Sequence, residues 1–174
     1  AMAAHRQFDG VLVDADAVVG EVDDGDAVLR RLLNAGRSGA AAETLGVGSG
    51  AMDITVDYIK GRSQFGSLIG SFQALQHRIS HLYSEIEVAR ACVLKAQQLL
   101  DEGSASADMM VSVAKAKAGK ATALSVKEGV QMHGGVGMTD EYDIGLYMKR
   151  DRALQEFMGD VNYHTNLVAE MQGY

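Results

Sequence analysis

The sequence predicts an all-α fold, an antiparallel four-helix bundle with a short extended N-terminal arm. Apolar residues recur every three or four positions over long stretches, the spacing that places them on one face of an α-helix. Proline, which breaks helix interiors, is absent from all 174 residues. Short polar or glycine-rich segments separate the periodic stretches, as in bundles whose long helices are joined by short loops. We therefore expect residues 25–174 to form the bundle and residues 1–24 to be a separate segment.

The first expected helix runs from about Asp26 to Tyr58, with Asp24 or Asp26 as its N-cap. A glycine inside a helix costs up to about 1 kcal/mol relative to alanine. Several glycines in this helix therefore predict the close approach of a neighbouring helix or ligand, or a local break. They are Gly36, Gly39, Gly46, Gly48 and Gly50.

Three further long helices are expected over about 72–100, 106–132 and 139–158, and a short last one over 160–171. Asp101-Glu102-Gly103-Ser104 ends the second helix, and Gly134-Gly135-Val136-Gly137 ends the third. Thr139-Asp140-Glu141 resembles the N-terminal cap of the fourth. The lysines of the third helix are expected to face water; they are Lys115, Lys117, Lys120 and Lys127.

The segment before the first helix alternates short apolar pieces with Asp-Gly and Asp turn residues. This pattern predicts one or two extended pieces within Phe8–Val19. An isolated ribbon is only marginally stable in water, so another part of a protein must cover it. We interpret the chain as the tail of a larger protein.

Composition and charge narrow the classes of function. A formal net charge of −7 argues against a nucleic-acid partner. Cys92, the single cysteine, excludes an intramolecular disulfide. No apolar run is long enough to span a membrane and no signal peptide is recognisable, so we expect a cytoplasmic location. His77 and His81 have the i, i+4 spacing of metal ligands, but no third ligand accompanies them and we predict no metal site.

The stretch Tyr58–Gln76 carries the strongest functional signal. It interrupts the helical pattern with a turn that combines a cation, an amide and an aromatic ring: Arg62, Gln64 and Phe65. An arginine offers a planar fork of donors that matches phosphate oxygens, and glycine lets the backbone turn sharply. Taken alone, Arg62 is more typical of an ordinary helix-end cation. Together with the turn, it indicates a phosphorylated ligand that carries a ring.

A second glycine-rich turn follows Gln131 at the end of the third expected helix. The backbone N–H groups of such a turn can face an anion. His133, at the same helix end, is more typical of a hydrogen-bonded terminal histidine than of a catalyst.

These motifs, in this order on long helices, resemble the C-terminal helical domain of the acyl-CoA dehydrogenases. The motifs are Tyr58-x-x-x-Arg62-x-Gln64-Phe65-Gly66, Phe72-Gln73-x-x-Gln76-His77 and Gln131-x-x-Gly134-Gly135-x-Gly137. The resemblance covers about Phe8 to Gly173. It implies that residues 1–24 are a remnant of a middle β-domain or linker, and that an N-terminal helical domain and most of the β-domain are missing.

The resemblance also implies an FAD cofactor and a set of contact residues. The diphosphate and adenosine parts of FAD would contact Arg62, Gln64, Phe65, Phe72, Gln73, Gln131, Gly134, Gly135, Asp160 and Asn162. Asn34 and Arg37 would lie close to an acyl-CoA substrate. The implied assembly is a homotetramer, or a heterotetramer with a paralogous subunit. Electrons would pass to electron-transfer flavoprotein or a similar acceptor.

The sequence departs from the family at the catalytic base. Family members remove the α-proton of an acyl thioester with a carboxylate. The two positions at which relatives carry that glutamate are here Met158 and Gly36. Either a partner subunit supplies the base, or another acid does, or the activity is lost. The candidates for another acid are Glu141, Glu156 and Asp160. We expect a flavoprotein that dehydrogenates an acyl-CoA as one subunit of a heteromeric enzyme; the alternative is an inactive helical assembly domain.

Overall fold

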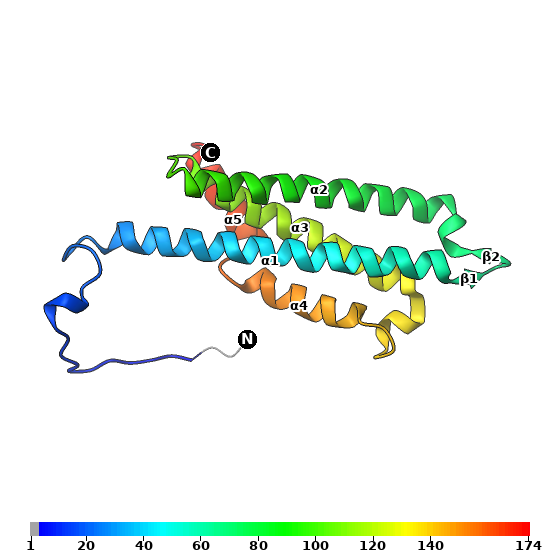
Figure 1. Cartoon of the computed structure of the whole chain (residues 1–174), viewed down its shortest axis with the longest axis horizontal. Coiled ribbons are helices and arrows are strands. Elements are labelled where there is room, and N and C mark those ends of the chain that lie inside the picture. Colours follow the sequence, from blue (N-terminus) through cyan, green and yellow to red (C-terminus); the bar gives the residue numbers. More distant parts are fainter. Residues whose placement is uncertain (1–3) are drawn as a thin grey trace.

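The protein is a bundle of helices packed side by side along one long axis (Figure 1). The computed structural model describes residues 4–174. Three long helices, α1 (Gly25–Gly61), α2 (Gln73–Asp101) and α3 (Ala107–His133), carry most of the bundle. Two shorter helices, α4 (Ile144–Glu156) and α5 (Val161–Met171), complete it. The predicted all-α, four-helix packing is therefore confirmed, with α4 and α5 sharing the fourth position.

The core lies between the three long helices and is rich in alanine. Leu82, Ile86 and Val111 are the large residues of this core that have no exposed surface, and Ala41, Ala89, Ala114, Ala118 and Ala121 pack among them. Small side chains let helix axes approach closely, because the interaxial distance depends on the residues at the contact. A smaller cluster of Ala51, Val126 and Ile144 attaches α4 to α1 and α3.

Helices α1 and α3 run parallel and are joined by buried hydroxyl groups. Thr122 Oγ1 donates to the carbonyl of Thr44, and Ser125 Oγ donates to that of Gly48, both at 2.7 Å. A Cβ on Gly48 would lie 2.5 Å from Thr122 Oγ1. The glycine-rich first helix is therefore continuous, and the alternative of a local break is wrong. At Gly48 the missing side chain lets a neighbouring helix approach.

Helix α3 is central, since it packs against α1, α2, α4 and α5. For this reason the expectation that Lys115 faces water is wrong: only 1 % of this residue is exposed. Lys120 and Lys127 are exposed, as predicted. A helix packed against four neighbours keeps only a narrow solvent face, and Lys115 lies outside it.

The start of the fourth helix and the segment between the first two helices also differ from the sequence expectation. Helix α4 begins at Ile144 rather than at Thr139. Thr139 Oγ1 donates to the carbonyl of Val136 and accepts from the N–H of Glu141, so it closes a turn after the 3-10 helix η3 (Gly134–Met138). Between α1 and α2 the chain forms a short hairpin of β1 (Ser63–Gln64) and β2 (Ser67–Leu68), followed by the 3-10 helix η2 (Ile69–Ser71).

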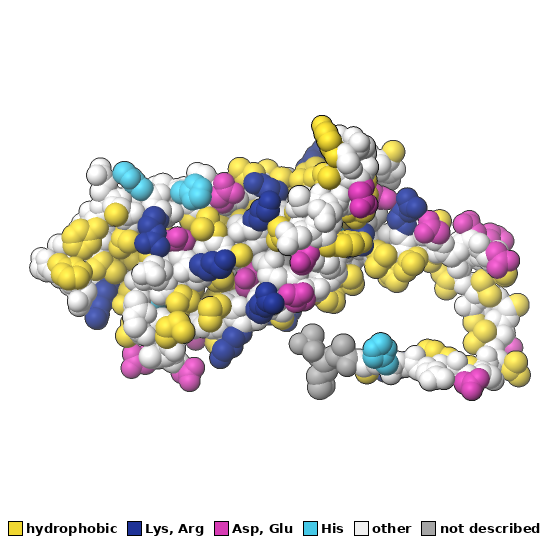
Figure 2. All heavy atoms as spheres, turned by 180° about the vertical axis from the view of Figure 1, so that it is seen from behind, with side chains coloured by type: hydrophobic (Ala, Val, Ile, Leu, Met, Phe, Trp, Pro, Cys, Tyr) yellow, Lys and Arg dark blue, Asp and Glu magenta, His cyan; other side chains and the backbone are white. Residues whose placement is uncertain are grey.

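The N-terminal arm, residues 4–24, leaves the bundle as an extended trace with one 3-10 turn, η1 (Ala15–Ala17) (Figure 1). Within the described residues it pairs with no strand. Its large apolar side chains are exposed, Leu12 by 98 % (Figure 2). That residues 1–24 belong to another domain stays a prediction, and residues 1–3 lie outside the described part. No described helix is long and apolar enough to cross a membrane.

Candidate functional site

The hairpin places the predicted cation and aromatic ring at one end of the bundle (Figure 1). Arg62 follows the last residue of α1; its N–H donates to Tyr58 and its carbonyl accepts from Ile69, which closes the hairpin. The side chain is exposed and pairs with no carboxylate among residues 4–174. An exposed, unpaired guanidinium keeps its fork of donors available for a ligand.

Phe65 occupies an unusual backbone conformation at the hairpin tip. Its φ of 55° and that of Gly66, 79°, are both positive, as in the turns that best fit two-residue hairpins. Such a conformation is uncommon for a bulky residue. The Phe65 ring is 91 % exposed and meets the Phe72 ring edge-on at a centroid separation of 6.3 Å. Figure 2 shows hydrophobic surface gathered at this end of the bundle.

The second glycine turn lies at the same end, because α1 and α3 are parallel. Gln131, Gly134 and Gly135 are exposed there. His133 is buried, and its ring Nδ1 bonds the carbonyl of Gly129 at 2.7 Å. The ring also stacks on Tyr58 at a centroid separation of 4.2 Å. His133 thus holds the end of α3 against α1, as its sequence context predicts.

Asp160 and Asn162, also predicted to contact the cofactor, lie elsewhere. They flank the start of α5, where Val161 packs beside Gly119 in the middle of α3. With a rise of about 1.5 Å per residue, Gly119 lies roughly 20 Å along α3 from its glycine turn. The predicted cofactor residues therefore form two groups, one at the hairpin end and one at the α4–α5 turn.

The two alternative positions of the family base meet in space. The Met158 side chain reaches α1 beside Gly36, where a Cβ would lie 2.8 Å from Met158 Cε and 3.5 Å from Sδ. We call this place, formed by Gly36, Arg37, Met158 and Tyr163, the base locus. No carboxylate belongs to it. A thioether does not accept protons near neutral pH.

Arg37 is held at the base locus by Tyr163 of α5. Its Nη2 donates to the Tyr163 hydroxyl at 2.9 Å, and the guanidinium carbon lies 5.5 Å from the centre of the ring. A cation over an aromatic face is attracted by the ring quadrupole, which adds to the hydrogen bond. The structure therefore fixes the predicted substrate arginine next to the predicted base position.

The carboxylates proposed as a substitute base are engaged in surface or capping roles. Asp160 Oδ1 accepts from the N–H of Tyr163 at 2.7 Å and caps α5. Glu156 pairs with Arg152 at 3.1 Å, with 63 % of its side chain exposed. Glu141 is exposed in the turn before α4. None of these three carboxylates belongs to the base locus.

Three buried titratable groups near the α4–α5 turn were missed by sequence reasoning: Lys115, Asp151 and His164. Burial lowers the pKa of Lys115 and of His164, and raises that of Asp151. Perturbed groups of this kind concentrate at functional sites. A signal existed for Lys115, because small and apolar residues surround it on most faces of its helix.

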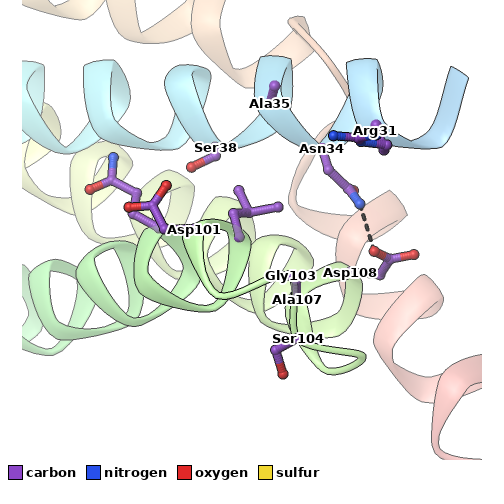
Figure 3. Close-up of a pocket in the computed structure, with 11 residues that line it drawn as sticks. Arg31, Asn34, Ala35, Ser38, Asp101, Gly103, Ser104, Ala107 and Asp108 are labelled. Carbon is purple, nitrogen blue, oxygen red and sulfur yellow. Dashed lines mark hydrogen bonds between the residues drawn. The ribbon is translucent and has the colours of Figure 1, made fainter. Parts of the chain in front are cut away.

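Asn34, predicted to contact substrate, lines a groove of about 650 Å³ between α1, α2 and α3 (Figure 3). The groove is bordered by Arg31, Asn34, Ala35, Ser38, Gln97, Leu100, Asp101, Gly103, Ser104, Ala107 and Asp108. Asn34 is buried, and its amide donates to Asp108 at 2.6 Å. Its contact with substrate stays a prediction.

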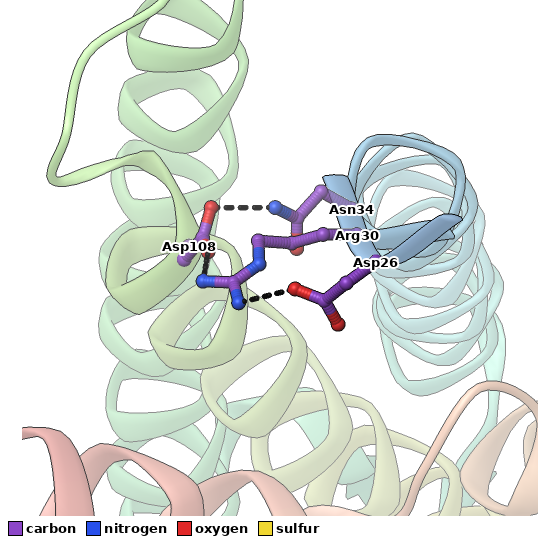
Figure 4. Close-up of polar contacts among 4 residues, drawn as sticks. All are labelled: Asp26, Arg30, Asn34 and Asp108. Atoms are coloured by element: carbon purple, nitrogen blue, oxygen red, sulfur yellow. Dashed lines mark hydrogen bonds and ion pairs between the residues drawn. The ribbon is translucent and has the colours of Figure 1, made fainter. Parts of the chain in front are cut away.

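The same aspartate connects α3 to the first turns of α1 (Figure 4). Arg30 lies between Asp26, at 2.8 Å, and Asp108, at 3.6 Å. These partly exposed charges contribute little individually, but the buried Asn34 amide requires its partner. We interpret these polar contacts as holding the first turns of α1 against the start of α3.

Comparison with known proteins agrees with the fold. The family profile "Acyl-CoA dehydrogenase, C-terminal domain" matches residues 23–172. The short/branched chain specific acyl-CoA dehydrogenase of Bos taurus mitochondria is 34 % identical over 163 residues, 94 % of this chain and 38 % of that protein. The acyl-CoA dehydrogenase IpdE2 of Mycolicibacterium smegmatis is 38 % identical over 158 residues, 91 % of this chain and 47 % of that protein.

Solved structures agree as well. Butyryl-CoA dehydrogenase from Megasphaera elsdenii superposes with a TM-score of 0.87 at 29 % identity, covering 92 % of this chain and 42 % of that one. A steroid enzyme designated Tcur3481-Tcur3483 superposes with a TM-score of 0.81 at 32 % identity, covering 84 % of this chain and 40 % of that one.

The fold and the family profile define a helical domain that is homologous to part of the FAD-dependent acyl-CoA dehydrogenases. The chain belongs to the acyl-CoA dehydrogenase family, whose C-terminal domain it contains. It spans less than half the length of the relatives described above.

Proposed function

We propose that this chain contributes the C-terminal domain of an FAD-dependent enzyme that removes hydrogens from the α and β carbons of an acyl-CoA, in a heteromeric assembly whose partner chain supplies the carboxylate base. The base locus carries this proposal. The cation Arg37 is held there beside Met158 and Gly36, and a proton acceptor is missing from the four residues of the locus.

The exposed groups of the hairpin end fit FAD. Arg62 would pair its guanidinium with the diphosphate, since a guanidinium binds phosphate oxygens through two parallel donors. The exposed Phe65 ring offers a face or edge to adenine. A Cβ on Gly134 or Gly135 would meet open space, so a ligand can approach that backbone. The chemistry that FAD supplies when bound is acceptance of the β-hydride.

In this proposal the chain's own residues at the base locus orient the substrate and exclude water, and they do not transfer protons. Arg37 would stabilise negative charge that develops on a thioester enolate at the base locus, because Tyr163 already holds its guanidinium in place. Met158 fills the place of a carboxylate with an apolar group and excludes water. The paired designation of the related steroid enzyme, Tcur3481-Tcur3483, supports a search for a second chain.

The test compares the full-length protein alone with the same protein co-expressed with a glutamate-bearing paralogue. We expect no acyl-CoA-dependent dye reduction and no exchange of the substrate α-proton without the partner, and both activities with it. Full activity of the protein alone would refute the proposal. FAD retention without activity in either preparation would instead favour the inactive assembly domain.

A further inference from the structure

The α4–α5 turn holds two consecutive residues in the left-handed backbone region. Met158 has a φ of 63° and Gly159 a φ of 102°. Glycine adopts this conformation freely, but a methionine there is strained and persists only when its surroundings impose it. The turn determines where the residue-158 side chain points. Its buried polar contacts are therefore relevant to the base locus.

Lys115 of α3 holds one side of this turn. Its Nζ donates to the carbonyls of Leu154 and Gly159, both at 3.0 Å. Leu154 belongs to the last turn of α4, whose carbonyls have no partner within the helix and attract a cation. A lysine is almost never fully buried without such partners. The ammonium thus ties the end of α4 to the start of the next segment.

His164 of α5 holds the other side. Its ring Nε2 lies 3.0 Å from the Met158 carbonyl oxygen. A carbonyl only accepts hydrogen bonds, so Nε2 carries a proton and donates it to this bond. The imidazole is fully buried and lies against the turn, since a Cβ on Gly159 would be 2.9 Å from Nε2. The carbonyls of residues 158 and 159 are therefore both bound by buried side chains from neighbouring helices.

We propose that Lys115 and His164 are positioning residues that aim the residue-158 side chain at Gly36 and Arg37. The inference rests on the proposed function in one respect: the base locus is taken to be the place where a carboxylate base would act. The contacts are with the backbone of the turn, so the direction is independent of whether position 158 carries methionine or a carboxylate. Without them, residue 158 relaxes from its left-handed conformation and its side chain leaves α1.

Disulfide trapping measures this direction without any turnover. The reporter is the full-length protein with Gly36→Cys and Met158→Cys, in a Cys92→Ser background that removes the native thiol. Only Cε and Sδ of Met158 lie within 4 Å of the place of a Cβ on residue 36, so two shorter cysteine side chains need a spacer between them. The two thiols are therefore joined through disulfides to a short bis-methanethiosulfonate, and the rate at which this disulfide bridge forms reports how often the side chains meet. Lys115→Met and His164→Phe remove the donors, and Lys115→Arg keeps a cation with donors as the matched control.

We expect both donor-removing variants to form the disulfide bridge at least about tenfold more slowly than the reporter, with Lys115→Arg between them and the reporter. The denaturant midpoint of each variant is measured in parallel, because lost stability alone would lower the midpoint and leave the trapping rate unchanged. An unchanged rate, or a reporter that forms no disulfide bridge, would overturn the proposal. If Lys115→Met does not fold, Lys115→Gln, which can still reach one carbonyl, replaces it under the same criterion.

The trapping assay contains no acyl-CoA and needs no flavin. Slower trapping together with an inactive co-expressed complex would contradict the proposed function and leave the positioning role intact. An unchanged trapping rate together with an active complex would contradict the positioning role and leave the proposed function intact.

Discussion

The methyl end of Met158 lies against Gly36, 2.8 Å from the place that a Cβ on residue 36 would occupy. Residues more than a hundred positions apart in sequence thus compete for one volume. The two alternative base positions are therefore one locus, reached from α1 and from the α4–α5 turn. A carboxylate introduced from either side reaches the same place.

This relationship predicts two routes to a proton acceptor. In full-length protein, Met158→Glu should raise acyl-CoA dehydrogenation, since general base catalysis contributes about 10²–10⁴-fold. Met158→Gln, of equal shape but without basicity, is the control. Dye reduction at saturating acyl-CoA measures both. Equal rates for the two variants would refute the assignment of position 158.

The second route starts from α1. Gly36→Glu alone has the Met158 methyl in its path, whereas Gly36→Glu with Met158→Ala does not. We expect the double variant to exceed the single one, because neighbouring substitutions that share one volume are not additive. If Gly36→Glu alone is as active as the double variant, the thioether moves aside without cost.

Arg62 gives a prediction about the cofactor. Arg62→Ala should weaken FAD retention roughly ten- to a hundred-fold, because a hydrogen bond to a charged group contributes about 1.5–3 kcal/mol. Lys60→Ala removes a nearby exposed cation from the last turn of α1 and is the matched control. Flavin absorbance per protein after gel filtration reports retention. Equal losses in both variants would indicate only a general charge effect.

The sequence predicted the helices well because apolar periodicity extends over many residues, proline is absent, and glycine-rich segments mark the ends of helices. The hairpin end was predictable because Arg62, Gln64 and Phe65 are neighbours in sequence. The base locus was predictable only as two separate positions. That the two positions lie together depends on how α1 packs against the α4–α5 turn, and no local sequence pattern encodes that contact.

Lys115 shows why the remaining part was missed. Its residue type predicts exposure, and the small and apolar residues that surround it in the helix are the one local sign of burial. Only the packing of α3 against four other helices buries it. The desolvation is offset by the carbonyls of Leu154 and Gly159, which reach it from a segment some forty residues further along the chain.

The closest approach of α1 and α3 predicts opposite effects for two glycines of one helix. Gly48→Ala places a Cβ 2.5 Å from Thr122 Oγ1 and 3.0 Å from its Cα. Overpacking of this kind destabilises by about 1–3 kcal/mol. Gly46→Ala meets nothing within 4 Å and should stabilise by up to about 1 kcal/mol through helix propensity. Urea unfolding followed by circular dichroism measures both; a common sign would contradict the assigned contact.

The last prediction concerns pH. Burial lowers the pKa of His164 below its usual value of 6.5. As pH falls through about 6.5, the unfolded chain binds a proton at this residue before the folded chain does. The stability from neutral His164 is therefore fully present above about pH 6.5 and is lost as pH falls toward the folded-state pKa, by at most about 1.4 kcal/mol per pH unit.

The comparison of wild type with His164→Gln isolates this proton, because the other titrating groups are common to both proteins. Among them, Asp151 acts with the opposite sign at lower pH, since burial raises its pKa and the folded protein then binds the proton first. At pH 7.5 the variant should be the less stable protein, because the bond to the Met158 carbonyl is weakened. The gap should narrow as pH falls to 5. Denaturant midpoints at pH 5.0, 6.0 and 7.5 test this, and a gap that stays constant over that range would show that His164 takes up its proton equally in the folded and unfolded chains.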